Sequence, residues 1–146
     1  MNNIDLTVCL VNHHANQITL NCIKSIFNKT TNALFEIIVV DNASNVDSSA
    51  DIAKRFPSVI LINNKHNQGF AVANNQAIKV ASGDFVILLN NDTVLQNDAL
   101  DKMINFMSNN PWVGIVTCKL FEADEKTIQR NCRSFPLTPF DTFFAR

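Results

Sequence analysis

The sequence predicts an α/β fold with a largely parallel sheet and helices on both faces of that sheet. Short continuous apolar runs recur along the chain, amphipathic segments with apolar residues at helical spacing separate them, and polar residues directly follow the runs. Apolar runs without polar alternation are typical of parallel strands that are covered on both faces. Right-handed crossovers would join such strands.

The composition is that of a folded domain of ordinary size. Of the 146 residues, 47% are hydrophobic and 17% are charged, which excludes a disordered chain. The net charge of −1, without a Lys/Arg cluster, gives no footprint for nucleic acid. The N-terminus does not resemble a signal peptide, and no stretch approaches the roughly 18 apolar residues of a membrane span. We therefore expect a cytoplasmic protein.

The chain has four cysteines, and none of them stands at the spacing of a zinc site. We expect reduced, mostly buried thiols rather than a disulfide or a metal site. The four are Cys9, Cys22, Cys118 and Cys132.

The first apolar run, over 6–11, predicts the first strand, and Asn12, His13 and His14 follow it. Adjacent histidines diverge in direction, and no further ligand stands at metal-binding spacing nearby. We interpret them as loop residues, one of which could pack against a ligand base. The next apolar residues recur at helical spacing and predict a helix over 17–27.

A second apolar run, over 35–40, predicts the second strand, and Asp41 follows it directly. Asp41 is a candidate site residue at the carboxyl end of a buried strand, or it only caps the next turn. Ser48 and Asp51 form a plausible capping box for a short helix that Pro57 closes.

The third strand is predicted over 59–62, and a polar loop leads from it to Gly69. Gly69 can take positive φ just before a helix over 71–81 begins. Alanines such as Ala73 and Ala77 on one side of this helix would let it approach the sheet closely. Its N-terminus, with free amides and a positive dipole end, faces the edge of Asp41 and could attract phosphate.

The stretch over 83–93 is the strongest chemical signal in the chain. Its apolar part, 85–89, predicts a central strand covered on both faces, and it stops in Asn90, Asn91 and Asp92. Ligands of parallel sheets bind beyond the carboxyl ends of the strands. The oxygen donors of Asn90 and Asp92 suit a hard divalent cation that carries substrate phosphates. The alternative is a simple turn.

The last regular elements are a helix that Asn97 caps and that ends near 110, and a fifth strand over 113–117. Beyond Cys118 the alternation stops. The chain then ends in an apolar tail without a clear period, whose surface we expect to seek a partner, either a second copy in a homodimer or a peripheral membrane face. The aromatic residues of this tail are Phe135, Phe140, Phe143 and Phe144.

Three blocks in a fixed order resemble the family-two nucleotide-sugar glycosyltransferases, especially their rhamnosyltransferase-like branch. The blocks span 38–47, 67–75 and 83–92. The first strand resembles the family's opening strand, with Asn-His-His in place of the usual Asn-Tyr-Asn. The resemblance runs from about residue 5 to Pro136. It implies the GT-A, Rossmann-like fold of nucleotide-diphospho-sugar transferases, incomplete at its C-terminus.

The resemblance also implies roles for residues. Asp41 matches the acid that binds the nucleoside, and Asn90-Asn91-Asp92 matches the Asp-x-Asp motif that holds Mg²⁺ or Mn²⁺, with a neutral oxygen at its first position. Metal ligands would be Asn90 and Asp92. The nucleotide-binding set is Val11, Asn12, Asp41, Asn67, Gly69 and Asn74.

By this resemblance, residues 1–118 form the nucleotide-sugar-binding domain and residues 119–146 begin a truncated acceptor or catalytic part. The reaction would transfer a sugar from a UDP- or dTDP-linked donor to a glycan or lipid-linked acceptor with inversion. The general base is expected beyond Arg146. The nearby carboxylates, Glu122, Asp124 and Glu125, lie in a charged run typical of a solvated loop.

Two other classes of function deserve comparison. The chain could be a non-catalytic nucleotide-sugar-binding or dimerisation module that uses its Phe-rich tail. A dinucleotide-dependent enzyme is disfavoured because no Gly-x-Gly-x-x-Gly follows the first strand.

Overall fold

The computed structural model describes residues 3–44 and 46–129. Cys132, the block at 133–136 and the Phe-rich tail lie outside these residues. The described chain divides into two compact units, one up to Gly114 and one from Ile115 onward. The sequence placed the domain boundary after Cys118, and the assignment of the second part to acceptor binding stays a prediction.

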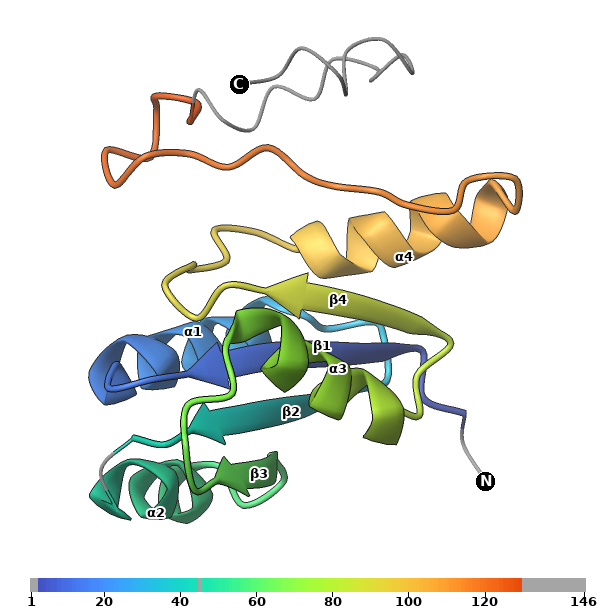
Figure 1. Cartoon of the computed structure of the whole chain (residues 1–146). Coiled ribbons are helices and arrows are strands. Elements are labelled where there is room, and N and C mark those ends of the chain that lie inside the picture. The colour runs from blue at the N-terminus through green and yellow to red at the C-terminus, as the bar shows by residue number, and fades with distance from the viewer. Residues whose placement is uncertain (1–2, 45, 130–146) are drawn as a thin grey trace, which may run out of the picture. The chain divides into compact units, whose positions relative to one another are not determined.

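The first unit is built on a four-stranded sheet in the order β3-β2-β1-β4 (Figure 1). All three pairings are parallel, which confirms the predicted α/β class. The strands are β1 (Leu6–Asn12), β2 (Phe35–Asn42), β3 (Ile60–Asn64) and β4 (Phe85–Leu89). The helices are α1 (Asn16–Lys29), α2 (Val46–Arg55), α3 (Phe70–Val80) and α4 (Ala99–Asn109).

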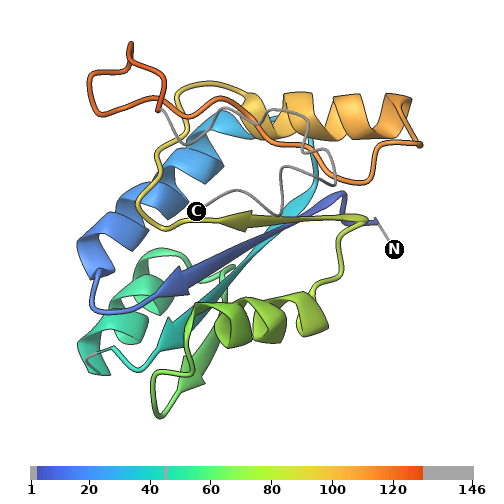
Figure 2. The same ribbon diagram turned by 45° about the horizontal axis from the view of Figure 1, so that its top comes forward.

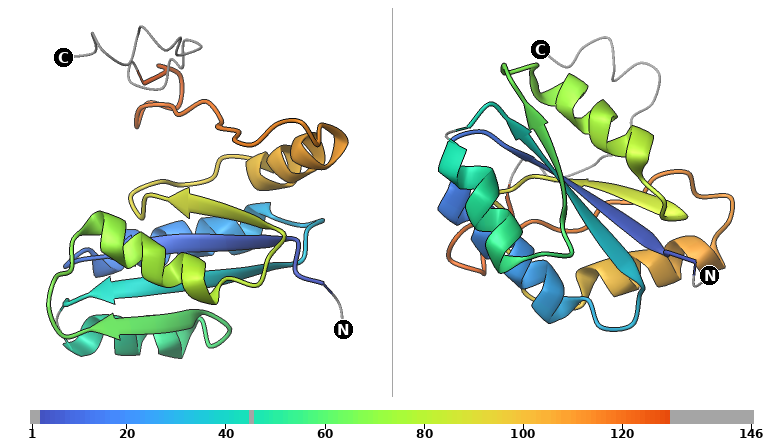
Figure 3. Two further views of the ribbon diagram at one scale, coloured as in Figure 1. Left: turned by 45° about the vertical axis from the view of Figure 1, so that its right-hand side comes forward. Right: turned by 90° about the horizontal axis from the view of Figure 1, so that it is seen from below.

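Helices cover both faces of the sheet, as the sequence predicted. Figures 2 and 3 show α3 on one face and α1, α2 and α4 on the other. On the face of α3, Cys9, Ile38 and Val40 of the sheet pack against Ala73 and Ala77. These alanines are fully buried, so the small side chains bring the helix close to the strands.

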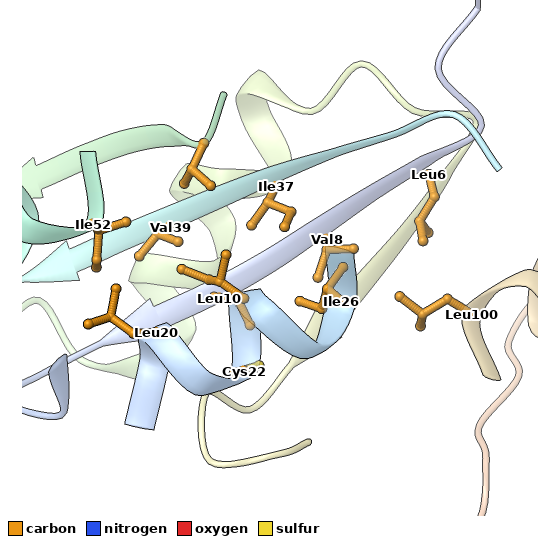
Figure 4. Close-up of a cluster of buried hydrophobic side chains, with 12 residues drawn as sticks. Leu6, Val8, Leu10, Leu20, Cys22, Ile26, Ile37, Val39, Ile52 and Leu100 are labelled. Atoms are coloured by element: carbon orange, nitrogen blue, oxygen red, sulfur yellow. The ribbon is translucent and has the colours of Figure 1, made fainter. Parts of the chain in front are cut away.

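The larger core lies on the opposite face of the sheet (Figure 4). Val8 and Leu10 of β1 stand opposite Ile37 and Val39 of β2 in the strand register. All four side chains are buried, and each such burial contributes about 1.5–3 kcal/mol. Helices α1, α2 and α4 close this layer with Leu20, Ile23, Ile26, Ile52 and Leu100.

The position of β4 differs from the prediction of a central, doubly covered strand. Among the residues that the structure describes, β4 is an edge strand, and Val86 and Leu88 are 43% and 51% exposed. Leu88 pairs with Cys9, so it lies on the face of α3, but α3 packs over β1 and β2 instead. The apolar run therefore identified a strand correctly and its place in the sheet wrongly.

Three other local predictions were also wrong. Residues 113–117 form no strand. Ser48 lies inside α2 rather than capping it, because the helix already begins at Val46. The N-cap of α4 is Asp98 instead of Asn97, and it makes no side-chain capping hydrogen bond.

The described part of the second unit is a short turn structure. Phe121 and Ile128 form an antiparallel bridge, and between them Asp124 accepts hydrogen bonds from the backbone amides of Lys126 and Thr127, at 2.9 and 2.8 Å. Glu122, Asp124 and Glu125 are exposed, as expected for a solvated loop.

Cys9, Cys22 and Cys118 are free thiols, as predicted, and the first two are buried. Within the described ranges, no helix is both long and apolar enough to cross a bilayer.

Candidate functional site

Polar residues gather where the four parallel strands end. Because the strands run in one direction, their carboxyl ends meet at one edge of the sheet (Figure 1). Asn12 stands opposite Asp41 at this edge, and Asn42 stands opposite Asn64. The loop after β4 begins there with Asn90. Every group that the sequence singled out on a strand end thus reaches the same edge, where parallel sheets bind ligands.

Asp41 is held at the end of β2 with only 4% of its surface exposed. Its Oδ1 accepts a hydrogen bond of 2.7 Å from the backbone amide of Ser44, and its Oδ2 accepts one of 3.4 Å from Nδ2 of Asn12. Ala43, between Asp41 and Ser44, has positive φ, at 65°. Asp41 therefore does cap the turn after β2. The same turn fixes its carboxylate at the sheet edge.

Asn12 is fully buried, and its side-chain amide is occupied by protein partners. Nδ2 donates to the hydroxyls of Ser48 and Ser44, at 2.8 and 3.1 Å. Oδ1 accepts from the hydroxyl of Thr19 at 2.9 Å. Asn12 holds the elements around the edge together. Val11, beside it, is half-buried and packs in the α3-side core.

Asn42 organises the loop before α3, and sequence reasoning did not single it out. Its Nδ2 donates to Oδ1 of Asn67 at 2.7 Å, and its Oδ1 accepts from the backbone amide of Gln68 at 2.9 Å. Asn64 adds a bond of 3.1 Å to the same oxygen and pairs with Gln76 of α3. The only feature of the sequence that could have identified Asn42 is its position directly after Asp41, as the second polar residue that follows the apolar run over 35–40.

His13 belongs to this network rather than to a metal site. Its Nδ1 lies 2.8 Å from the carbonyl oxygen of Asn42, and its Nε2 lies 3.2 Å from Nδ2 of Asn67. A carbonyl only accepts, so Nδ1 carries a proton, and Nε2 accepts from Asn67 in the neutral ring. The interpretation of His13 as a loop residue agrees with these contacts.

Gly69 caps α3 with a φ of 81°, as the sequence predicted. Its amide donates to Oδ1 of Asn67 at 2.8 Å. The first-turn amides of α3 carry the positive end of the helix dipole. Asn74 is 5% exposed, and its Nδ2 donates back to the carbonyl of Phe70 at 3.1 Å, within its own helix.

The loop after β4 is a tight turn. The carbonyl of Asn90 accepts from the amide and the hydroxyl of Thr93, at 3.2 and 2.7 Å. Asn91 is half-buried and donates through Nδ2 to the Thr19 hydroxyl at 2.8 Å. Asp92 is exposed. Burial raises the pKa of the Cys22 thiol to about 11; a hydrogen bond with Thr93 lowers it, and the negative charge of Asp92 adds a smaller increase.

The donor set around Asp92 fits a cation that arrives with phosphates. No three His, Cys, Asp or Glu residues gather into a metal cage within residues 3–44 and 46–129. Mg²⁺ is commonly held by one or two carboxylates together with substrate phosphates and water. The exposed carboxylate of Asp92 and the amide oxygen of Asn90 are hard donors of this kind.

Comparison with known proteins gives a consistent result. Residues 7–144 match the model of the family described as Glycosyl transferase family 2. A poly(ribitol-phosphate) beta-glucosyltransferase of Bacillus spizizenii is 30% identical over 72% of this chain and 17% of its own length. An uncharacterised glycosyltransferase of Methanocaldococcus jannaschii is 29% identical over 70% of this chain and 37% of its own.

A poly-beta-1,6-N-acetyl-D-glucosamine synthase of Staphylococcus aureus is 36% identical over 56% of this chain and 20% of its own length. The crystal structure of S. aureus TarS in complex with UDP superposes with a TM-score of 0.67 at 19% identity, over 74% of this chain and 33% of that one. This likeness shows the GT-A-like fold. The chain spans well under half the length of each of these relatives.

Proposed function

This chain belongs to glycosyl transferase family 2, and we propose that it forms the donor-binding part of an enzyme that uses a nucleotide-diphosphate sugar. The observation that carries the proposal is the shared sheet edge, where Asp41, the N-terminus of α3 and the Asn90–Asp92 turn come together. The donor would be linked to UDP or dTDP. The TarS structure with the same fold was solved in complex with UDP, which supports a nucleotide-linked donor.

The nucleoside end of the donor would lie at Asp41. Each oxygen of its carboxylate accepts one hydrogen bond from the protein, from Ser44 and Asn12, so each keeps a lone pair that can accept from a base or a ribose. Asn67 and Gly69 shape the loop next to it, and Val11 and Asn12 form the strand end beneath it. The diphosphate would lie toward the first turn of α3, where Gly69 and Asn74 flank free amides.

Asn90 and Asp92 would hold Mg²⁺ or Mn²⁺ at the diphosphate. When bound, such an ion stabilises the charge of the leaving nucleoside diphosphate. The residues of this chain bind and orient the donor, so that an acceptor hydroxyl can attack the anomeric carbon with inversion. The carboxylate that takes the proton from this hydroxyl is proposed to lie outside the described residues, since Glu122, Asp124 and Glu125 are exposed in a turn.

We further propose that the enzyme belongs to the rhamnosyltransferase-like branch of the family and that its acceptor is a glycan or a lipid-linked glycan. Its proposed location is the cytoplasm, with peripheral contact with the membrane. The alternative of a non-catalytic or dimerisation module rests on the Phe-rich tail, which lies outside the described residues.

Isothermal calorimetry with UDP, dTDP and GDP, each with Mn²⁺ and with EDTA, tests the proposal. One nucleotide should bind in a metal-dependent way. Contacts to charged groups contribute about 1.5–3 kcal/mol, so Asp92→Asn and Asp41→Asn should each raise its Kd about tenfold or more.

Asp84→Asn is the matched control. Asp84 is an exposed carboxylate just before β4, at the opposite end of that strand from Asp92, and it accepts from Asn3 at 2.7 Å. Its replacement should leave the Kd unchanged. Absence of binding for every nucleotide, or equal effects of Asp84→Asn and Asp92→Asn, would count against the proposed site.

A further inference from the structure

The hydroxyl of Thr19 lies between the two strand ends that carry Asp41 and Asp92. Thr19 is in the first turns of α1 and is fully buried. Its Oγ1 accepts from Nδ2 of Asn91 at 2.8 Å and lies 2.9 Å from Oδ1 of Asn12, to which it donates. The carbonyl of Ala15, at 3.0 Å, shares the hydroxyl proton as a second acceptor.

The direction of this chain of hydrogen bonds is fixed at one end by a charge. The carboxylate of Asp41 only accepts, so the Asn12 amide must turn its Nδ2 toward it. Oδ1 of Asn12 then faces Thr19 and requires a donor there, which the hydroxyl supplies. The hydroxyl oxygen is left to accept from Asn91. Asn91, Thr19, Asn12 and Asp41 therefore form one ordered relay.

The relay joins parts of the chain that are far apart in sequence. Thr19 and Asn91 are separated by 72 positions, and Asn12 and Asp41 by 29. Asn12 has further acceptors in Ser44 and Ser48, so the Asp41 end is held by several bonds. At the other end of the relay, Asn91, which precedes Asp92, is held by its hydrogen bond to Thr19.

We propose that Thr19 is a positioning residue that couples divalent-metal binding at Asp92 to nucleotide binding at Asp41. This inference rests on the proposed function. A nucleoside diphosphate that bridges both groups requires them at a fixed separation. The relay sets that separation through the buried hydroxyl of Thr19, which lies between the side-chain amides of Asn12 and Asn91. Removal of the hydroxyl breaks the bond to Asn91 and so loosens the Asp92 turn. Nδ2 of Asn12 keeps its hydrogen bonds to the hydroxyls of Ser44 and Ser48.

The test variant is Thr19→Val, which keeps the shape of the side chain and removes the hydroxyl. Calorimetry on the full chain gives the Kd of UDP, or of whichever nucleotide binds, with Mn²⁺ and with EDTA. The Kd with EDTA divided by the Kd with Mn²⁺ measures the coupling, because it gives the factor by which the metal tightens nucleotide binding. Loss of the bond from Asn91, which is the one that holds the Asp92 turn, predicts a ratio reduced about five- to tenfold, with the EDTA value nearly unchanged. Thr19→Ser should restore the wild-type ratio.

Ser25→Ala is the matched control for a merely structural effect. Ser25 is also a buried hydroxyl of α1 that accepts from the loop after β4, but its donor is the amide of Leu95 at 3.0 Å. Both variants should lower the melting temperature, and only Thr19→Val should change the ratio. If Thr19→Val does not fold, Asn91→Ala removes the donor at the half-buried end and should reduce the ratio as well.

The outcomes separate the two proposals. A folded Thr19→Val or Asn91→Ala protein with the wild-type ratio overturns the relay and leaves the donor site intact. The same reduction in Ser25→Ala also overturns it. A wild-type chain that binds no nucleotide under either condition overturns the proposed function, and the coupling falls with it.

Discussion

The side-chain amide of Asn42 donates to Oδ1 of Asn67 over 2.7 Å and so joins the end of β2 to the loop that leads into α3. The orientation of both amides is set by the backbone. Gln68 donates its N–H to Oδ1 of Asn42, and Gly69 donates its N–H to Oδ1 of Asn67. Neither amide can flip without opposing a fixed donor.

We therefore expect Asn42→Asp to loosen this loop, although it keeps the size of the side chain. The substitution replaces a donor by a carboxylate oxygen that faces Oδ1 of Asn67. Loss of a buried hydrogen bond costs about 1–3 kcal/mol of unfolding free energy. Hydrogen exchange should accelerate at the amides of Gln68 and Gly69. Asn21→Ala, on the exposed face of α1, is the control, and equal protection in both variants would contradict the expectation.

Gly83 is required by a close approach between β1 and the start of β4. A Cβ at this position would lie 2.5 Å from the backbone nitrogen of Thr7 and 2.6 Å from the carbonyl carbon of Leu6. Gly83→Ala should cost about 1–3 kcal/mol or more in urea denaturation, because only backbone movement relieves the contact. Gly114→Ala meets nothing within 4 Å and should change the value by less than about 0.5 kcal/mol. Equal stability of the two variants would refute this account.

Glu36 gives the stability a predictable pH dependence. Partial burial opposes its ionisation, but hydrogen bonds from Thr7 Oγ1 at 2.7 Å and from the amide and hydroxyl of Ser82 outweigh it and hold the pKa below its ordinary 4.5. A lowered folded-state pKa adds stability above the unfolded-state value. That stability is lost as the pH falls through the folded-state value.

The difference in unfolding free energy between wild type and Glu36→Gln should therefore be larger at pH 7 than at pH 3. Urea denaturation at the two pH values measures it. Thr7→Val removes one donor and should reduce the pH dependence of the otherwise native chain. An unchanged dependence in Thr7→Val would show that these hydrogen bonds do not lower the pKa of Glu36.

The thiol of Cys22 should report on the charge of Asp92. Burial and, to a smaller extent, the Asp92 carboxylate raise the pKa of Cys22 to about 11, so the thiol is protonated at pH 8. Burial and Glu36 likewise raise the pKa of Cys9 to about 11. Both should react slowly with iodoacetamide in the native protein. Asp92→Asn should speed the reaction of Cys22 and leave Cys9 unchanged, as peptide mass spectrometry can measure. Equal rates at Cys22 before and after the change would contradict this.

The sequence by itself determined eight helices and strands among the described residues of the first unit and the sheet edge at which the candidate site residues lie. Continuous apolar runs around Val8, Val39, Leu61 and Ile87 predicted the four strands, because local side-chain pattern indicates which segments are buried. Polar residues directly after those runs, such as Asp41 and Asn90, then had to meet at one edge once the strands were parallel. Gly69 was identified as a helix start because the backbone there needs positive φ.

Only the tertiary structure decided which strand is at the edge of the sheet and which polar residues face protein. The apolar run of β4 looks central, yet Leu88 is half exposed, because strand order depends on crossovers that no local pattern encodes. Asn12 and Asn42 owe their roles to partners 36 and 25 positions away, in Ser48 and Asn67. Such contacts follow from packing helices onto both faces of the sheet, and residue spacing along the chain does not contain them.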